Sequence, residues 1–173
     1  WNNAFCLMAE LGLRPTEVNK LIIKKDPTTK EFYWWCTYEK KGGGGTTEPR
    51  RIEPLPLMDR DGKEVQWNLI DRFRANLLPL PERVDGDACK VYLQRREGWQ
   101  QLKEMMKKKE GSNLVPYSFR HYYSLRGHIA GIDSGSMASS MGHSIEAHHR
   151  AYPYSSKAST TNAFKQARER LTA

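Results

Sequence analysis

The sequence has few cysteines and no long apolar run over its 173 residues. The three cysteines, Cys6, Cys36 and Cys89, lack both the even number of a disulfide framework and the C-x-x-C spacing of a zinc site. No apolar run approaches the ~18–20 residues that a membrane-spanning helix needs. These absences argue against a disulfide-stapled secreted domain and against a membrane protein, and they favour a reducing, cytoplasmic setting.

Acidic residues are also in deficit. Lysine and arginine number 28 against 20 acidic residues, which gives a net charge of +8 and favours a polyanionic partner such as nucleic acid. A basic domain without such a partner explains the charge equally well. A mean hydropathy of −0.76 fits one highly solvated domain that is still long enough to bury a core. The chain begins with Trp1 and has no signal-like start, so we expect a portion of a longer protein.

The spacing of apolar and turn-forming residues predicts a mainly α-helical chain with one small antiparallel β-sheet, in the α+β class. Helical spacing recurs over residues 5–11, 65–77 and 118–129. Shorter helices are expected near Pro15 and on both sides of His143.

Two extended arms flank the glycine run at residues 42–45, which predicts a β-hairpin with a long tip. The arms are EFYWWCTYEKK and RRIEPLPL. Farther along, residues 90–109 carry seven basic side chains against two acidic ones, which predicts a cationic helical face. No repeat divides the chain, so residues 1–173 are expected to form one domain.

Three of the five histidines lie in MGHSIEAHHRAY, residues 141–152. A zinc site is the weaker explanation, because His148 and His149 point about 100° apart on a helix and Glu146 is the only nearby acid. For this adjacent pair we favour an inert place on a solvated helix surface. That explanation suits His143 less well, because a glycine precedes it and a tyrosine follows nine residues later.

Five stretches of the chain together resemble the motif boxes of one enzyme family. They are ELGLRPTEV (10–18), KKGGGGTTEPRRIEPLP (40–56), VPYSFRHYY (115–123), MGHS (141–144) and Tyr152. The catalytic domain of the tyrosine recombinases, or phage integrases, typically has a T-G-x-R-x-x-E box, a hairpin lysine before an R-x-x-P-L strand, an H-x-x-R box, an L-G-H box and a tyrosine nine residues beyond. Each box alone is a weak signal, but their joint order and spacing form a strong one.

The resemblance implies a site-specific recombinase or integrase that acts on double-stranded DNA. In this family a tyrosine hydroxyl attacks a phosphodiester, leaving a 3′-phosphotyrosyl bond and a free 5′-hydroxyl. Arg14 and Arg120 match the two arginines that bind the phosphate in bidentate fashion. Lys41 matches the lysine that protonates the leaving oxygen, with Lys40 as the alternative. No metal or other cofactor is implied, because arginine charge takes the place of a metal ion.

The resemblance also assigns the nucleophile. Tyr152 is the expected attacking residue, favoured over Tyr154 by its spacing from His143, which would bind the phosphate or assist proton transfer. The chain departs from the family at Tyr117, where the H-x-x-R box begins with histidine. A phenol donates a hydrogen bond, but a pKa near 10 makes it a poor base. The route by which the proton leaves Tyr152, through water or His143, is therefore open.

Other residues near these boxes are expected to have supporting roles. We expect Glu17 to buttress Arg14, and His121 and His128 to be structural. The basic side chains expected to contact DNA are Lys40, Arg50, Arg51, Lys107 and Lys108.

Two other functions use or retain the same residues. A type IB topoisomerase has a similar set but relaxes supercoils, and a catalytically inactive remnant of a mobile element would only bind DNA. The spacing from MGHS to the tyrosine resembles the integrases more closely. For an integrase, the resemblance implies a bacterial or phage-derived cytoplasmic protein, monomeric alone, that forms a homo-oligomer, a tetramer, on DNA and is then associated with the nucleoid.

The last segment, residues 157–173, is expected to supply a linker and a helix within this domain. Residues 153–162 are mostly small and polar, as in an extensible linker. N-cap candidates are Thr160, Thr161 and Asn162, and the following apolar stripe is Phe164, Ala167 and Leu171. A short helix must bury this stripe, either on its own domain, as we expect for an isolated chain, or on another protomer, as the resemblance implies.

Overall fold

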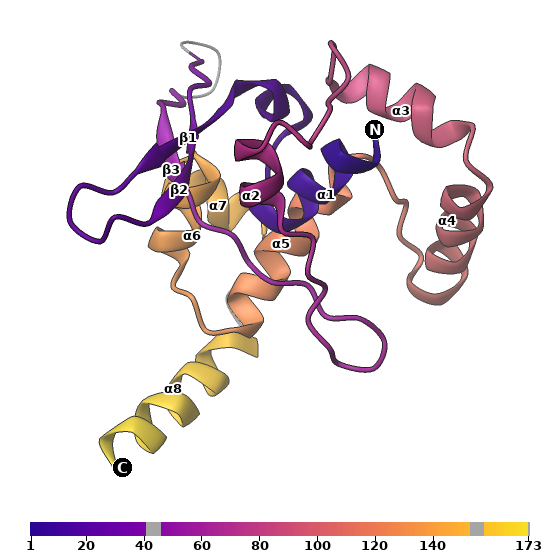
Figure 1. Ribbon diagram of the computed structural model, residues 1–173. Coiled ribbons are helices and arrows are strands. Elements are labelled where there is room, and N and C mark those ends of the chain that lie inside the picture. The colour runs from indigo at the N-terminus through magenta and orange to yellow at the C-terminus, as the bar shows by residue number, and fades with distance from the viewer. Residues whose placement is uncertain (41–45, 153–157, 173) are drawn as a thin grey trace.

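The computed structural model describes residues 1–40, 46–152 and 158–172 (Figure 1). Its helices are α1 (Asn2–Leu11), the 3-10 helix η1 (Pro15–Lys20), α2 (Leu69–Arg74), α3 (Gly86–Gln94), α4 (Glu97–Glu110), α5 (Ser118–Ile129), α6 (Ser134–Met141), α7 (Ile145–Ala151) and α8 (Ala158–Leu171). Its strands are β1 (Leu21–Lys25), β2 (Phe32–Cys36) and β3 (Arg50–Ile52). The expected α+β class, mainly helical with a small antiparallel sheet, is confirmed.

The three strands form one antiparallel sheet in the order β1-β2-β3. The expected hairpin is the β2–β3 pair, in which Trp34 faces Ile52 across the strands. Both side chains are buried, and Phe73 of α2 packs its ring edge-on against Trp34. The sequence did not predict β1, because Leu21–Lys25 is too short and too mixed in polarity to show a clear alternation.

Helices α1 and α5 pack side by side; α1 supplies five buried residues of the main core, and Phe119 of α5 packs against that core. Helix α1 ends at Gly12, as its apolar pattern predicts, and this glycine has a left-handed φ of 65°. A Cβ at Gly12 would lie 2.4 Å from the ring of Tyr123 on α5, so a side chain is excluded both by backbone conformation and by contact. The glycine brings the chain back across α5 and into η1.

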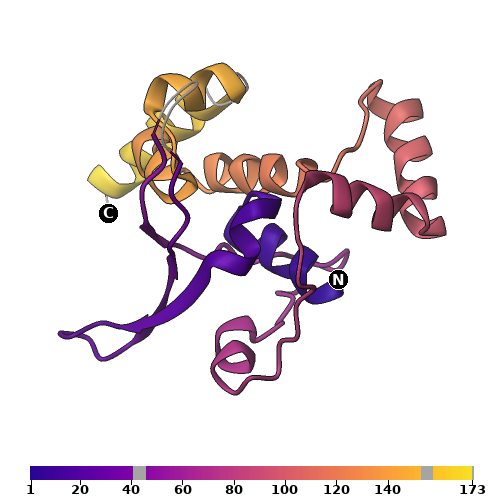
Figure 2. The same ribbon diagram turned by 90° about the horizontal axis from the view of Figure 1, so that it is seen from above.

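Helices α6 and α7 lie beside the β2–β3 hairpin, and α6 contacts β3 (Figure 1). Helices α3 and α4 lie on the side of the molecule away from the sheet (Figure 2). Helix α4 has no buried residue, and its Trp99 stacks on Phe119 of α5. The sheet, α5 and the α6–α7 pair thus surround one region, while α3 and α4 stand outside it.

Two predicted helices differ from the observed ones. Of the helix predicted over residues 65–77, only α2 is helical. The residues before α2 are extended, because the amide of Val65 donates to the carbonyl of Leu57. The cationic segment 90–109 is split between α3 and α4. A turn at Arg95 and Arg96 separates them, with their amides bonded to residues three positions back.

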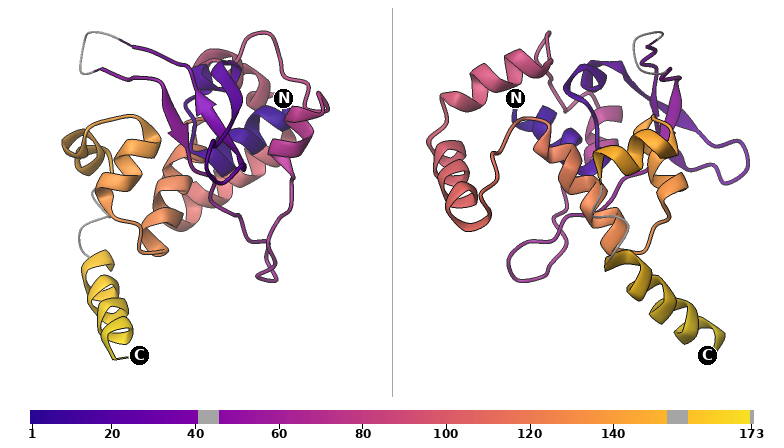
Figure 3. Two further views of the ribbon diagram at one scale, coloured as in Figure 1. Left: turned by 60° about the vertical axis from the view of Figure 1, so that its left-hand side comes forward. Right: turned by 180° about the vertical axis from the view of Figure 1, so that it is seen from behind.

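Helix α8 projects from the rest of the molecule (Figure 3). It begins at Ala158, so the predicted N-caps at residues 160–162 are wrong and lie inside the helix, while residues 153–157 of the expected linker are outside the described residues. Phe164 and Leu171 are 64% and 87% exposed, so the packing on its own domain that we expected of an isolated chain is not observed. No helix within the described residues is long and apolar enough to span a membrane.

Candidate functional site

A buried carboxylate, Glu17 on η1, holds three arginines from distant parts of the chain. Its Oε1 lies 2.7 Å from Nη1 of Arg14 and 2.9 Å from Nη2 of Arg50, which begins β3. Its Oε2 lies 3.7 Å from Nη1 of Arg120 on α5 and accepts a 2.8 Å hydrogen bond from the backbone of Arg14. The expectation that Glu17 buttresses Arg14 is confirmed, and the carboxylate organises two further guanidinium groups as well.

Glu17 and the arginines shift one another's pKa values. Burial by itself raises the pKa of Glu17, but Arg50, Arg120 and Arg14 outweigh it and hold that pKa below its ordinary value. Burial and the neighbouring charge of Arg14 lower the pKa of Arg120, and Glu17 opposes them. The carboxylate is therefore ionised at neutral pH and keeps like charges close together.

The same arginines also bind the carbonyl end of α6. Arg120 donates to the carbonyls of Gly12 and Met141 at 2.6 and 2.5 Å. Arg14 donates to Gly142 at 3.1 Å, and Nε of Arg50 donates to the carbonyl of Ser140 at 2.8 Å. The final carbonyls of a helix lack partners within the helix and carry partial negative charge, which suits cationic donors.

Only a glycine fits at position 142, where the backbone passes close to the side chain of Arg50. It caps α6 with a left-handed φ of 68°, and a Cβ there would lie 2.5 Å from the guanidinium carbon of Arg50. This close approach explains the glycine of the MGHS motif and places His143 directly after the arginine cluster.

Tyr152 follows α7 and lies beside three histidines, with 1% of its surface exposed. Its ring centroid lies 4.8 Å from that of His148, 5.2 Å from His121 and 6.0 Å from His143. Its phenol also acts electrostatically on the guanidinium of Arg120. The tyrosine is thus enclosed between the imidazoles and the arginine cluster.

Tyr117, the residue that departs from the family motif, lies at the same cluster. Its phenol acts electrostatically on the guanidinium of Arg14, and its ring centroid is 5.9 Å from the guanidinium carbon of Arg120. The ring packs edge-on against His121, which in turn packs against Tyr152. This chain of aromatic contacts connects the start of α5 with the end of α7.

Three histidines form a continuous hydrogen-bonded chain behind Tyr152. Nε2 of His143 lies 2.8 Å from Nδ1 of His148, whose Nε2 lies 2.8 Å from Nε2 of His128. Burial, with Arg120 and other cations, lowers the pKa of His143 to about 3, and burial with His128 lowers that of His148 to about 4. The predicted solvated position of His148 is wrong: this side chain is fully buried, whereas its neighbour His149 is exposed.

The described part of the chain brings together most of the residues predicted to be catalytic: Arg14, Tyr117, Arg120, His143 and Tyr152. Lys41, the predicted general acid, lies outside the described residues. A cleft of about 220 Å³ opens at the cluster, lined by Arg14, Tyr38, Lys40, Thr46, Thr47, Gly142, His143, Ser144 and Ala147. Lys40 is exposed at this cleft and pairs with Thr47 across the hairpin.

Two of the arginines predicted to contact DNA are placed otherwise. The side chain of Arg50 is only 10% exposed and is bound by Glu17 and helix carbonyls, so it belongs to the cluster and not to an outer surface. Arg51 points to the opposite face of β3, because successive strand residues alternate, and pairs there with Glu53 at 2.7 Å. Lys107 and Lys108 are exposed on the last turn of α4, and their contact with DNA stays a prediction.

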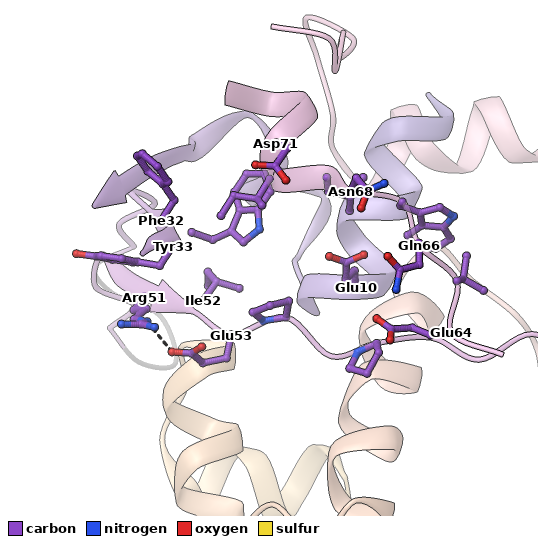
Figure 4. Close-up of a pocket in the computed structure, with 17 residues that line it drawn as sticks. Glu10, Phe32, Tyr33, Arg51, Ile52, Glu53, Glu64, Gln66, Asn68 and Asp71 are labelled. Atoms are coloured by element: carbon purple, nitrogen blue, oxygen red, sulfur yellow. Dashed lines mark ion pairs between the residues drawn. The ribbon is translucent and has the colours of Figure 1, made fainter. Parts of the chain in front are cut away.

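A second cavity, of about 420 Å³, lies between the strands β2 and β3 and helix α2 (Figure 4). Glu10, Glu53, Glu64 and Asp71 are among its lining residues. Burial raises the pKa of Glu10 to about 7. The carboxylates of this cavity would repel a phosphate, whereas the cleft beside the arginine cluster would attract one.

No group of three or more histidine, cysteine, aspartate or glutamate side chains within the described ranges is arranged to hold a metal ion. The described residues at the site supply guanidinium, imidazole and phenol groups, with the amine of Lys40 at the cleft.

Neither a protein-family model nor a curated protein sequence matches the chain. Solved structures do match in fold. The Tn1549 transposon integrase in complex with transposon right end DNA aligns at a TM-score of 0.50 and 18% identity, over 99% of this chain and 58% of the integrase chain. The same integrase with a circular intermediate DNA aligns at 0.49 and 19% identity, over 98% and 59%. The chain thus has an integrase fold and spans less than two thirds of that integrase chain.

Replacing Glu17 by glutamine should destabilise the protein strongly. The amide keeps the shape and part of the hydrogen bonding but removes the charge that offsets three buried or half-buried arginines. We expect a loss of about 3–5 kcal/mol in the free energy of unfolding near neutral pH, measured by urea denaturation. Because the folded-state pKa of Glu17 is lowered, this difference should shrink as the pH falls through that pKa.

Glu53→Gln is the matched control for this measurement. Glu53 pairs with Arg51 at the surface, where their side chains are 57% and 47% exposed, so its loss should cost less than about 1 kcal/mol. Equal costs for the two variants would contradict the central role of Glu17.

Proposed function

We propose that the chain is the catalytic domain of a tyrosine-type site-specific DNA recombinase, which cleaves and rejoins double-stranded DNA through a 3′-phosphotyrosyl intermediate. The observation that carries this proposal is the convergence of Arg14, Arg120, His143 and Tyr152, from three separate parts of the chain, beside one positively charged cleft. The fold shared with a DNA-bound transposon integrase supports DNA as the partner.

The arginine cluster suits the stabilisation of a phosphoryl-transfer transition state. The attacked phosphorus gains negative charge on its non-bridging oxygens, and guanidinium groups held in place beforehand stabilise that charge without reorganisation. In the described structure, Nε of Arg120 and Nη1 of Arg50 are buried donors without a hydrogen-bond partner. A phosphate at the cleft would supply acceptors for such donors.

The proposed reaction needs a nucleophile that attacks phosphorus and a general acid that protonates the leaving oxygen. The hydroxyl oxygen of Tyr152 forms a bond to phosphorus while the bond from phosphorus to the 5′-oxygen breaks. Lys41 gives its proton to this leaving oxygen, and it follows directly in the sequence after Lys40, which lines the cleft. Tyr117 would donate its hydroxyl hydrogen to a phosphate oxygen beside Arg14, a task that a phenol can perform.

DNA would be held by charge outside the cleft as well. Lys40 at the hairpin and Lys107 and Lys108 on α4 are the exposed lysines that we assign to phosphate contacts, in keeping with the net charge of +8. Assembly of protomers on DNA, up to a tetramer, would then use α8, whose apolar side chains Phe164 and Leu171 are exposed.

Tyr152 is expected to become linked to a DNA 3′-phosphate. The intact protein, incubated with a nicked suicide substrate, should give a covalent adduct that mass spectrometry maps to Tyr152. Tyr152→Phe should abolish the adduct, whereas Tyr154→Phe and the exposed Tyr122→Phe should retain it. An adduct on another tyrosine would overturn the assignment, and the absence of any adduct would favour the inactive remnant. Joining of two sites, as opposed to relaxation of a supercoil, separates a recombinase from a topoisomerase.

Lys41 is expected to act on the leaving group only. Lys41→Ala should therefore regain cleavage when the bridging 5′-oxygen is replaced by sulfur, a leaving group that needs no proton. Arg120→Ala should lose on the order of 10²–10³ in rate with either substrate, because its charge stabilises the phosphoryl oxygens. If Lys40→Ala is the variant that sulfur rescues, the general acid is Lys40.

Helix α8 is expected to link protomers on DNA. Replacing Phe164 and Leu171 together by serine should weaken cooperative binding to paired half-sites and leave binding to a single half-site unchanged, as a gel-shift titration would measure. Glu169→Ala changes an exposed residue on another face of α8 and serves as the control. Unchanged cooperativity in the double variant would rule out this contact.

A further inference from the structure

The hydrogen-bonded histidines extend from the arginine cluster to the far end of α5. Arg120 begins the chain, with Nη2 3.3 Å from Nδ1 of His143. The chain then passes through the fully buried His148 to His128, which is 8% exposed and lies in the last turn of α5. The proposed function assigns a role to His143 alone, so two buried histidines are unexplained.

The donors and acceptors of this chain can have only one arrangement. A guanidinium is always a donor, so Nδ1 of His143 accepts and its Nε2 carries the hydrogen. That Nε2–H donates to Nδ1 of His148, so the hydrogen of His148 is on Nε2 and is donated to Nε2 of His128. His128 then carries its hydrogen on Nδ1. All three neutral rings therefore point their hydrogens away from the site.

We propose that His143, His148 and His128 form a proton relay that takes the phenolic proton of Tyr152 out of the reaction centre. This inference rests on the proposed function, since it requires attack by Tyr152. It assigns positioning and proton-transfer roles to His148 and His128, which do not touch the DNA themselves.

The protons balance along this path. When a phosphate takes the hydrogen bonds of Arg120, Nδ1 of His143 becomes free to accept the proton that Tyr152 loses as its oxygen bonds to phosphorus. His143 passes its Nε2 proton to Nδ1 of His148, and His148 passes its own Nε2 proton to Nε2 of His128. The result is one cationic imidazole at His128 and two neutral ones, and rejoining of the DNA strand reverses each transfer.

Electrostatics favour the positive charge at the outer end of the relay. Arg120, Arg14, Arg50 and His148 act on His143 and oppose a charge there. His128, His149 and Arg120 act on His148. At His128 burial lowers the pKa, and His149 is the titratable neighbour that acts on it, with no arginine among the causes. The carbonyl end of α5 also favours a cation in its last turn. The electrostatic free energy of a proton that enters at His143 therefore falls as the proton moves outward to His128.

The arrangement of hydrogens can be tested without any DNA. NMR of isotope-labelled imidazole nitrogens in the intact protein, near pH 7, should find the hydrogen on Nε2 of His143 and His148 and on Nδ1 of His128. A different tautomer in any of the three rings would break the direction of transfer and overturn the relay.

The role in cleavage is tested with His148→Gln. Glutamine can accept from His143 and donate to His128, so it preserves the hydrogen bonds, but an amide does not pass a proton on. In single-turnover cleavage of a suicide substrate, we expect the rate to fall about 10²-fold near pH 7 and to rise about tenfold per pH unit, as hydroxide replaces the relay. Glu146→Gln, a change in an exposed residue of α7 that does not act on any of the three histidines, should leave the rate and pH profile of the natural protein unchanged.

The outcomes separate the relay from the proposed function. If the natural protein cleaves and His148→Gln cleaves as fast with the same pH profile, the relay is wrong and the recombinase assignment stands. If the natural protein forms no adduct at any pH, the recombinase assignment fails, and the relay fails with it. A slow His148→Gln variant with a steep pH profile supports both, because loss of packing alone would lower the rate without adding a dependence on hydroxide.

Discussion

The ion pairs of Glu17 are the interaction on which the rest of the site depends. Three guanidinium groups from η1, β3 and α5 would repel one another in a medium of low dielectric constant, and a single buried carboxylate brings them together. Burial of charge is tolerated here because each arginine also finds backbone carbonyls. The folding of the domain and the assembly of the arginine cluster are therefore coupled, since the contacts that join these elements also orient the arginines.

The end of α6 completes this arrangement through its backbone. A helix that ended elsewhere would not present the carbonyls of Ser140, Met141 and Gly142 to the arginines. The turn at Gly142 then sends the chain into α7, so that His143 and Tyr152 arrive on the same side of the cluster. The motif spacing of nine residues between them corresponds to one tight turn and one short helix, a distance that local geometry fixes.

The parts of this design that depend on local pattern could be predicted from the sequence. Helical spacing and Gly12 predict the C-terminal end of α1, and helical spacing predicts both ends of α5. The glycine run predicts the β2–β3 hairpin, and the resemblance to a family predicts the order of the motif residues. The burial of His148 and the inward turn of Arg50 could not be predicted, because they depend on which residues from remote segments lie opposite. Arg50 and Arg51 are neighbours in strand β3, so their side chains point to opposite faces of the sheet. This alternation is a local signal that distinguishes the two arginines once the position of the strand is known.

The charge of the cluster also decides what its histidines can do. Three arginines against one glutamate leave a net positive charge of two at the site, and the imidazoles beside it are kept neutral, with pKa values far below their ordinary range. A neutral imidazole adds little to the stabilisation of a negatively charged phosphate, but it can accept a proton on one nitrogen and release another from the opposite one. In the proposed reaction, the arginines would bind the phosphate and the histidines would move protons. Because the same positive field that would bind the phosphate would also drive a proton away from it, the two proposed roles support each other.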